Sequence, residues 1–413
     1  MANYYANHAQ MRDIMCDIHD EIKDKIGVRT IPVKKAIGMV LAHDITEIRQ
    51  NNFKGRAFKK GHIVREEDIS HLQKLGKENL FVLSIADDEM HEDDTTYALA
   101  GALMGEGVKI EGEPKEGRIN ILADRDGLLK INEDALMGFN MLGDVMCATL
   151  HDNTVVKKGQ IVAGTRAIPL VVKKEMVKKA VAIANSVKVS KCQSVKESDP
   201  LTLCNSDASC SGVVEVKELR KPKVGAVITG NEIYYGKIKD VFAPIITKKI
   251  EAFDGEIIGI YYAPDNEEFI EARLRDLIDA GADLLITTGG MSIDPDDVTR
   301  FAIRNLGATD ITYGSAVLPG AMFLVAYLSV KESKHQGVKG SDTLTHGYSD
   351  TSVIPILGIP ACGMYHKTTI FDLILPRVLA EEKIKRQELA ELGHGGLCLN
   401  CKECRYPVCP FGK

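Results

Sequence analysis

Residues 223–290 read KVGAVITGNEIYYGKIKDVFAPIITKKIEAFDGEIIGIYYAPDNEEFIEARLRDLIDAGADLLITTGG, and this stretch decides the fold. KVGAVIT (223–229), GEIIGIYYA (255–263) and ADLLITT (282–288) are short, nearly continuous apolar runs, which predict strands buried on both faces. The segments between them, 241–253 and 266–280, have the periodicity of amphipathic helices. Strands that alternate with such helices predict a parallel sheet covered on both faces, a three-layer α/β domain.

The same pattern continues toward the C-terminus. It predicts a helix at 297–306, strands near Ile311, at 323–328 and at 353–357, and a closing helix at 368–379. The polar stretch 331–352 interrupts the pattern and is predicted to be a surface loop insertion. We therefore expect one α/β domain over residues 223–390.

The N-terminal half predicts smaller β-rich α+β modules. Residues 1–86 favour a small mixed α/β module, with a helix at 11–25 and a helical segment, IPVKKAIGMVLAHDI, at 31–45. Short alternating strands between glycines indicate a β-rich module over 87–184. Residues 185–222 lose this periodicity and are interpreted as a linker or insertion, and 391–413 form a cysteine-rich tail.

Composition limits the classes of function. The 413 residues are 45% hydrophobic and 27% charged, as in ordinary soluble proteins, and the net charge of -6 argues against binding nucleic acid or an acidic membrane. The first residues contain no apolar leader, and the longest apolar run, 321–330, is too short to span a bilayer. Ten cysteines in such a chain favour reduced thiols. These features predict a cytoplasmic protein.

Three glycine-bearing loops follow predicted strands, where open parallel sheets bind ligands. Glycine lets backbone amides approach an anion, and threonine or serine hydroxyls add neutral donors, so the three loops together suit a phosphate. A single loop of this kind is more often ordinary turn chemistry. The candidate binding residues are Thr229, Gly230, Asn231 and Glu232 in the first loop, Thr287, Thr288, Gly289, Gly290 and Ser292 in the second, and Gly358, Pro360 and Ala361 in the third.

An acidic run, Asp294 to Asp297, follows the second loop and has two interpretations. Asp296 could cap the next helix, with neighbouring aspartates favouring its positive end. Alternatively Asp297, together with Asp265 and Asp240, supplies carboxylates that bind Mg²⁺ beside a phosphate. The two interpretations are compatible.

Four ordered motifs carry a resemblance to a known family. VITGNEIYYGKIKD (227–240) and ITTGGMSIDPDDVT (286–299) resemble the S-T-G-[DN]-E-L and T-[ST]-G-G segments of molybdopterin molybdotransferases, and the second also resembles the T-T-G-G loop of molybdopterin adenylyltransferases. VLPGAMFLVAYL (317–328) is similar to P-G-K-P-x-x-x-G, and LGIPACGMYHKTT (357–369) to G-L-P-G-N-P-x-S. The resemblance covers about 223–380, with a weaker similarity at 31–45.

This resemblance implies a site for molybdopterin and its terminal phosphate. It adds Pro319 and Gly320 to the binding residues and places functional aspartates at Asp265, Asp297 and Asp240. The sequence departs from the family at Ala321, where the family has lysine, and lacks the family's D-N-S-A-M-D-G-Y segment. Molybdopterin binding survives these losses better than molybdate insertion does.

Three functions remain open at this stage. An enzyme would use Mg²⁺ and a nucleotide in cofactor maturation, as a molybdotransferase or nucleotidyltransferase does. A carrier without catalysis would deliver the cofactor to a molybdoenzyme partner. A nucleotide-diphosphate hydrolase of the competence-damage type would act without any pterin. Relatives with this domain are often oligomeric, so a homo-oligomer is expected.

The tail carries four cysteines in the pattern C-x2-C-x2-C-x4-C-P. Thiolates this close can hold one soft metal centre, and the spacing is near that of a bacterial ferredoxin run, which slightly favours an iron–sulfur cluster over tetrahedral Zn²⁺. The remaining interpretation is a disordered tail whose cysteines have no role. The candidate metal ligands are Cys398, Cys401, Cys404 and Cys409.

Overall fold

The computed structural model describes residues 28–49, 53–83, 86–189, 212–291, 298–331 and 351–412. The chain divides into two compact units, which are described separately below. One comprises Met1–Arg125, Lys130–Leu150 and Lys158–Val216, and the other Asp126–Leu129, His151–Lys157 and Lys217–Lys413. The predicted helix at 11–25, most of the linker and most of the insertion at 331–352 lie outside the described residues.

The first module packs a small antiparallel sheet, in the order β1-β5-β2, around Leu41, Leu72 and Val82. The prediction of a helical segment at 31–45 is wrong. A single 3-10 turn follows Pro32, and Gly38, with φ +82°, turns the chain into two short strands. The elements are β1 (Val28–Pro32), η1 (Val33–Lys35), β2 (Val40–Leu41), β3 (Ile45–Arg49), β4 (Phe53–Phe58), α2 (Asp68–Lys74) and β5 (Asn79–Leu83).

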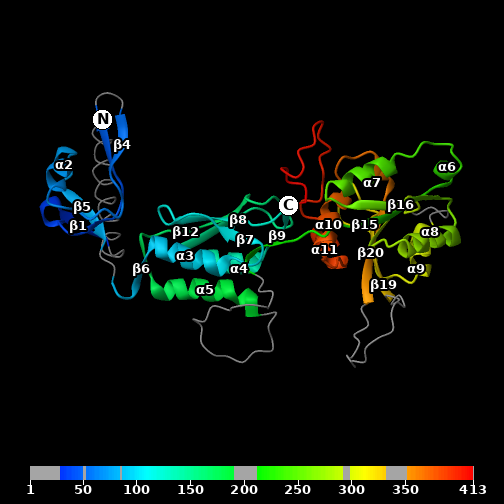
Figure 1. The fold of residues 1–413 in the computed structure, drawn as a ribbon, viewed down its shortest axis with the longest axis horizontal. Coiled ribbons are helices and arrows are strands. Elements are labelled where there is room, and N and C mark those ends of the chain that lie inside the picture. The colour runs from blue at the N-terminus through cyan, green and yellow to red at the C-terminus, as the bar shows by residue number, and fades with distance from the viewer. Residues whose placement is uncertain are drawn as a thin grey trace, which may run out of the picture. The chain divides into compact units, whose positions relative to one another are not determined.

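The second module is β-rich, as expected, and its largest sheet is antiparallel in the order β10-β12-β8-β7. Helix α3 packs against one face of this sheet, and α5 packs against α3 on the side away from the sheet (Figure 1). The elements are β6 (Glu89–His91), α3 (Glu92–Leu103), β7 (Val108–Ile110), β8 (Arg118–Ala123), β9 (Gly127–Ile131), α4 (Glu133–Asn140), β10 (Val145–Thr149), β11 (Val155–Val156), β12 (Ile161–Ala167), β13 (Val171–Lys173), α5 (Lys174–Val189) and β14 (Val214–Lys217).

The C-terminal half forms a six-stranded sheet in the order β16-β15-β17-β20-β19-β18. Four neighbouring strands are parallel, and β19 runs antiparallel to both of its neighbours. The elements are β15 (Lys223–Thr229), α6 (Asn231–Tyr234), α7 (Phe242–Glu251), β16 (Glu256–Ala263), α8 (Glu267–Asp279), β17 (Leu284–Thr288), α9 (Thr299–Asn305), β18 (Thr309–Tyr313), β19 (Leu324–Lys331), β20 (Thr351–Ile359), η2 (Ala361–Met364), α10 (Ile370–Leu379) and α11 (Arg386–Glu391).

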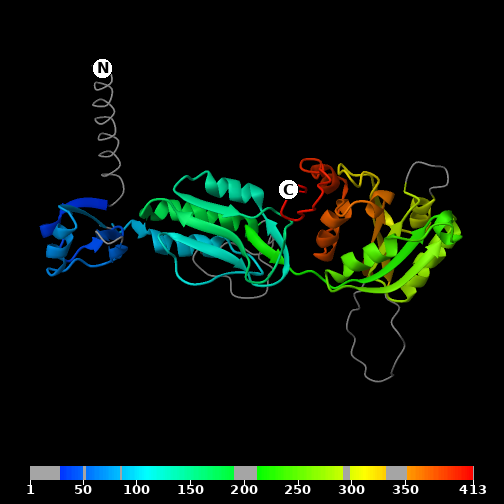
Figure 2. The same ribbon diagram turned by 90° about the horizontal axis from the view of Figure 1, so that it is seen from above.

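Both faces of this sheet are covered, which confirms the three-layer prediction. On one face α7 and α10 pack Ile246 and Phe371 against Ile228 and Ile286. On the other face, α8 and α9 pack their apolar side chains against the alternate strand residues, among them Leu285. In Figure 1, α7 lies on one side of β15 and β16, and α8 and α9 lie on the other; Figure 2 shows the same domain turned by 90°. Among the helices of the described residues, none is long and apolar enough to cross a bilayer.

Candidate functional site

The connections of the parallel strands diverge at one edge of the sheet. After β15 the chain continues into α7 on one face, whereas after β17 it continues into α9 on the opposite face. Because β15 and β17 are neighbours, their carboxyl ends flank a point where the connections diverge. Ligands of open α/β sheets bind at such switch points. The first and second predicted loops both begin here.

The two loops are joined through the Thr229 hydroxyl. Thr229 is buried at the end of β15 and donates a hydrogen bond of 2.8 Å to the carbonyl oxygen of Thr288. Its hydroxyl oxygen also lies 3.2 Å from that of Thr299, the first residue of α9. The sequence analysis omitted Thr299 from the site, although it ends the DDVT part of the second motif.

Gly289 and Gly290 are required by close packing as well as by backbone conformation. Both have positive φ, +78° and +54°. A Cβ atom on Gly289 would lie 2.4 Å from the Thr229 carbonyl oxygen, and one on Gly290 would lie 2.3 Å from the Thr299 hydroxyl oxygen. Any larger residue would push the two loops apart, so the sequence needs glycine twice in succession here.

Two buried hydroxyls next to this turn lack hydrogen-bond partners. Thr287 and Thr288 are fully buried, and neither Oγ1 atom has a partner within the described residues. Side chains alternate along β17, so Thr288 lies on the face covered by α7 and α10, and Thr287 on the face covered by α8 and α9. A buried, unpaired hydroxyl costs about 1–3 kcal/mol, so each such atom in a folded protein needs an explanation.

Asn231 and Asp265 tie the first loop to the loop after β16. The Asn231 amide donates to the Asp265 carboxylate at 3.0 Å, and the Asp265 amide donates to the Asn231 side-chain oxygen at 3.3 Å. Gly230 precedes this pair with φ +137°, and its amide donates to the Ala263 carbonyl. Glu232 is exposed in the short helix α6. The structure thus places Asp265 beside the first loop.

Asp240 has a different environment. Its carboxylate accepts hydrogen bonds from the amides of Phe242 and Ala243, at 2.8 and 3.0 Å, at the start of α7. The Tyr262 hydroxyl donates to the same carboxylate at 3.2 Å, and burial together with the nearby Asp240 charge raises the pKa of Tyr262. Asp240 therefore acts as a cap for α7 in this structure.

The third loop and the turn before β19 reach the same edge of the sheet. Gly358 pairs with Thr287 in the β17–β20 ladder, and the Met291 side chain occupies the position that a Cβ on Gly358 would need. Pro360 precedes η2 and accepts a hydrogen bond from Gly363. The remaining predicted residues, Pro319, Gly320 and Ala361, lie at this edge, whereas Ser292 and Asp297 lie outside the described residues.

The cysteine tail is folded against this domain, which contradicts the disordered alternative. Phe411 is buried in the core beneath α10, and the Tyr406 hydroxyl donates to the Asp372 carbonyl at 3.2 Å. The Cys398 amide donates to the Leu318 carbonyl at 2.8 Å, directly before the Pro319–Gly320 turn. The tail therefore packs next to the Pro319–Gly320 turn.

The four tail thiols differ in exposure. Cys398 and Cys409 pack against the core, whereas Cys401 and Cys404 are exposed. The Cys404 sulfur lies 3.2 Å from the Thr368 hydroxyl, and this hydrogen bond lowers the pKa of the thiol. Within the described residues, one group of three ligand atoms lies close enough to share a metal ion, and it is formed by His91, Glu92 and Asp93 rather than by the tail.

The family assignment follows from these loops and their residues. Residues 225–380 match the family described as "Probable molybdopterin binding domain". This chain carries a domain of the molybdopterin-binding family. Residues 30–84, most of the first module, match a family described as "Domain of unknown function (DUF8806)". The similarity to molybdopterin proteins noted in the sequence is thereby confirmed for the C-terminal domain.

Two curated relatives each match a limited share of the chain. A CinA-like protein of Mycobacterium avium is 36% identical over 89 residues, 20% of this chain and 20% of its own. A molybdopterin molybdenumtransferase of Synechococcus elongatus is 27% identical over 139 residues, 32% of this chain and 34% of its own. The chain thus spans about a fifth to a third of the length of these relatives.

Two solved structures are also similar to part of this chain. The tungsten cofactor synthesizing protein MoaB from Pyrococcus furiosus is 16% identical with a TM-score of 0.28, over 39% of this chain and 97% of that one. CinA from Thermoplasma acidophilum is 13% identical with a TM-score of 0.26, over 35% of this chain and 90% of that one.

Proposed function

We propose that the C-terminal domain binds molybdopterin, or its adenylylated form, through the terminal phosphate in the crevice between β15 and β17. On this proposal the protein acts in maturation of the molybdenum cofactor or in its delivery to a molybdoenzyme. The supporting observation is the pair of buried, unpartnered hydroxyls of Thr287 and Thr288 beside the Gly289–Gly290 turn.

Phosphate oxygens suit this environment. Each unpaired threonine hydroxyl can donate to an oxygen, and the donation would recover the cost of burying the hydroxyl without a partner. Both glycines of the turn are partly exposed, and glycine lets the backbone approach an anion closely. The family match over 225–380 favours a pterin ligand over other phosphates. The wider set of binding residues, from Thr229 to Ala361, remains a prediction on the same basis.

Catalysis is the less supported part of the proposal. Asp265 and Asp297 are the aspartates proposed to position Mg²⁺ beside the phosphate. Asp240 is already occupied by two helix amides and a tyrosine hydroxyl, so its proposed role needs those bonds to be exchanged. Ala321 offers no cation for molybdate. A carrier without turnover is therefore the main alternative.

A matched pair of variants tests the binding site. Thr288→Val and Thr287→Val each remove one unpartnered hydroxyl at nearly constant volume. The two hydroxyls lie on opposite faces of the sheet, and we expect the variant that removes the hydroxyl in contact with the ligand to weaken molybdopterin binding roughly tenfold or more. Both variants should fold as stably as the parent protein, because no internal hydrogen bond is lost. Equal, undiminished affinity in both variants would refute the proposed phosphate site.

An assay of product formation distinguishes the three functions. Purified full-length protein is incubated with molybdopterin, Mg²⁺ and either ATP or molybdate. Formation of an adenylylated or metal-loaded product supports the enzyme, and retained pterin without product supports the carrier. Hydrolysis of a nucleotide diphosphate without pterin binding, as in competence-damage-like proteins, would overturn the proposal.

We further propose that Cys398, Cys401, Cys404 and Cys409 bind a metal centre. Four thiolates around one Zn²⁺ would stand roughly 4 Å apart, since each zinc–sulfur bond is about 2.3 Å. The spacing of the four cysteines is near that of a bacterial ferredoxin run, which favours an iron–sulfur cluster over a single zinc ion. Metal analysis and visible absorption of protein purified without oxygen distinguish the two. Protein with neither iron nor zinc would contradict this proposal.

A further inference from the structure

In the described part of the chain, the helices of the second module pack against one face of its antiparallel sheet and leave the other face open. Helix α3 packs against the opposite face. Strand register sets two rows of side chains on the open face: Met146, Arg166 and Arg118 lie opposite one another across β10, β12 and β8, and Ala148, Gly164 and Asn120 form the next row. Residues two apart on a strand share a face, so the two rows are adjacent.

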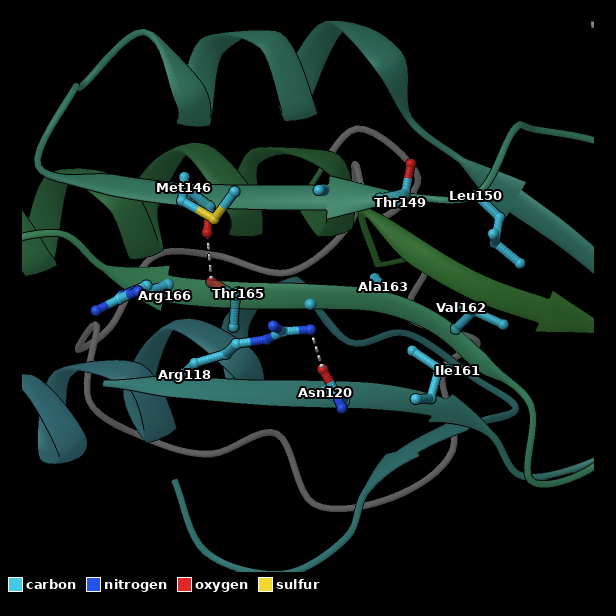
Figure 3. A pocket seen from close by; sticks show the side chains of 12 residues that line it. Arg118, Asn120, Met146, Thr149, Leu150, Ile161, Val162, Ala163, Thr165 and Arg166 are labelled. Carbon is cyan, nitrogen blue, oxygen red and sulfur yellow. Dashed lines mark hydrogen bonds between the residues drawn. The ribbon is translucent and has the colours of Figure 1, made fainter. Parts of the chain in front are cut away.

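The first row contains two arginines. Arg166 and Arg118 are register partners on neighbouring antiparallel strands. Among the described residues neither guanidinium is in an ion pair, although Arg118 donates a hydrogen bond of 3.3 Å to the Asn120 side chain. In Figure 3 the Arg166 side chain extends away from Arg118, whose guanidinium lies beside Asn120.

The second row creates a hollow beside those charges. Gly164 contributes no side chain and Ala148 only a methyl group, so the surface is depressed between Met146 and Asn120. The hollow measures about 480 Å³, within the range of small-molecule sites. Figure 3 shows the arginines toward one end, and Leu150 and Ile161, both exposed, toward the other. One end is therefore basic and the other apolar.

We propose that this hollow binds a small molecule that carries one anionic group, a phosphate ester or a carboxylate, on an apolar body. The anionic group accepts hydrogen bonds from the Arg118 guanidinium and, once the Arg166 side chain turns toward the hollow, from Arg166 as well. Planar guanidinium groups suit both phosphate and carboxylate oxygens. The apolar body covers the exposed side chains of Leu150 and Ile161. The site lies in a different unit from the molybdopterin crevice and does not depend on it.

The test titrates the full-length protein with phenyl phosphate, benzoate and inorganic phosphate, measured by calorimetry at low salt. Phenyl phosphate or benzoate should bind more tightly than inorganic phosphate, because only these two carry an apolar body. The tighter of the two identifies the natural head group. Absence of saturable binding by both would overturn the proposal.

Three variants locate the binding. Arg166→Gln should weaken it roughly tenfold or more, as expected for the loss of hydrogen bonds to a charged group. Gly164→Val should abolish it by filling the hollow, since Gly164 has ordinary strand geometry and valine suits a strand. Lys178→Gln on α5 removes the same charge elsewhere and should have no effect. Thr288→Val should also leave it unchanged.

Equal affinity in the parent and Gly164→Val proteins would refute the site. Light scattering completes the test, because an open sheet face could instead be occupied by a second copy of the chain. A dimer that Gly164→Val or Arg166→Gln dissociates would overturn the small-molecule proposal in favour of that interface.

Discussion

The two sheets of this protein present binding surfaces in different ways. The parallel sheet is covered on both faces, so its candidate site lies at one edge, where the loops after β15, β17 and β20 meet. The antiparallel sheet is covered by α3 on one face only, so its hollow lies on the other face. At the edge, Gly289 and Gly290 are fixed by close contacts with Thr229 and Thr299, whereas on the face Gly164 leaves space. Substitutions should therefore be costly at the edge and mild on the face.

The largest expected effect is that of Gly289→Ala. The new Cβ would lie 2.4 Å from a backbone oxygen of Thr229, at φ +78°, so strain and overpacking together should lower the free energy of unfolding by roughly 2–5 kcal/mol. Denaturant unfolding measures the loss. The control is Gly281→Ala, where φ is +94° but nothing lies within 4 Å, so about 1–2 kcal/mol is expected. Equal losses would show that loop contact is unimportant.

A smaller loss is expected from Asn140→Ala in the antiparallel module. The Asn140 side chain donates to the Cys147 carbonyl at 2.9 Å and accepts from the Cys147 amide at 2.8 Å, which fixes the edge strand β10. Loss of both bonds should cost about 1–3 kcal/mol in unfolding free energy. Met141→Ala, at a side chain that is 80% exposed on the same turn, should change stability by less than about 0.5 kcal/mol.

Gly164→Ala should be nearly neutral, in contrast to Gly289→Ala. The nearest atom to the added Cβ would be the Asn120 side-chain oxygen at 3.3 Å, which can move. Alanine also restricts the unfolded chain, so the free energy of unfolding should rise by up to about 1 kcal/mol. Thermal unfolding of both variants side by side measures this contrast. A loss as large as that of Gly289→Ala would remove the distinction between edge and face.

The smallest effect concerns thiol reactivity and leaves stability unchanged. Because the Thr368 hydrogen bond lowers the pKa of Cys404, its thiolate persists to lower pH than that of an ordinary cysteine. Burial raises the pKa of Cys147 to about 12, so this thiol stays protonated near neutral pH. In metal-free protein, iodoacetamide should label Cys404 and spare Cys147, as read by peptide mass spectrometry. Thr368→Val should slow Cys404 labelling at neutral pH but not at high pH.

The sequence predicted helices and strands correctly where the pattern of apolar residues was strong. The apolar runs at β15, β16 and β17 and the helices between them were predicted within a few residues. It failed at 31–45, where helical periodicity was outweighed by Pro32 and Gly38. Glu92, in the charged run at the start of α3, is 2% exposed. Periodicity does not report which neighbours a charged residue will meet.

The amino-acid pattern was enough to predict that a parallel α/β domain follows residue 222 and that threonine- and glycine-bearing loops end its strands. Apolar runs and turn residues act locally, and parallel topology places strand ends at one edge. The three-dimensional fold was needed to show that the hydroxyls of Thr287 and Thr288 lack partners among the described residues and that Arg118 is the register partner of Arg166. It also decided that the tail folds back onto α10. Those facts depend on contacts between residues far apart in the chain, which no local pattern encodes.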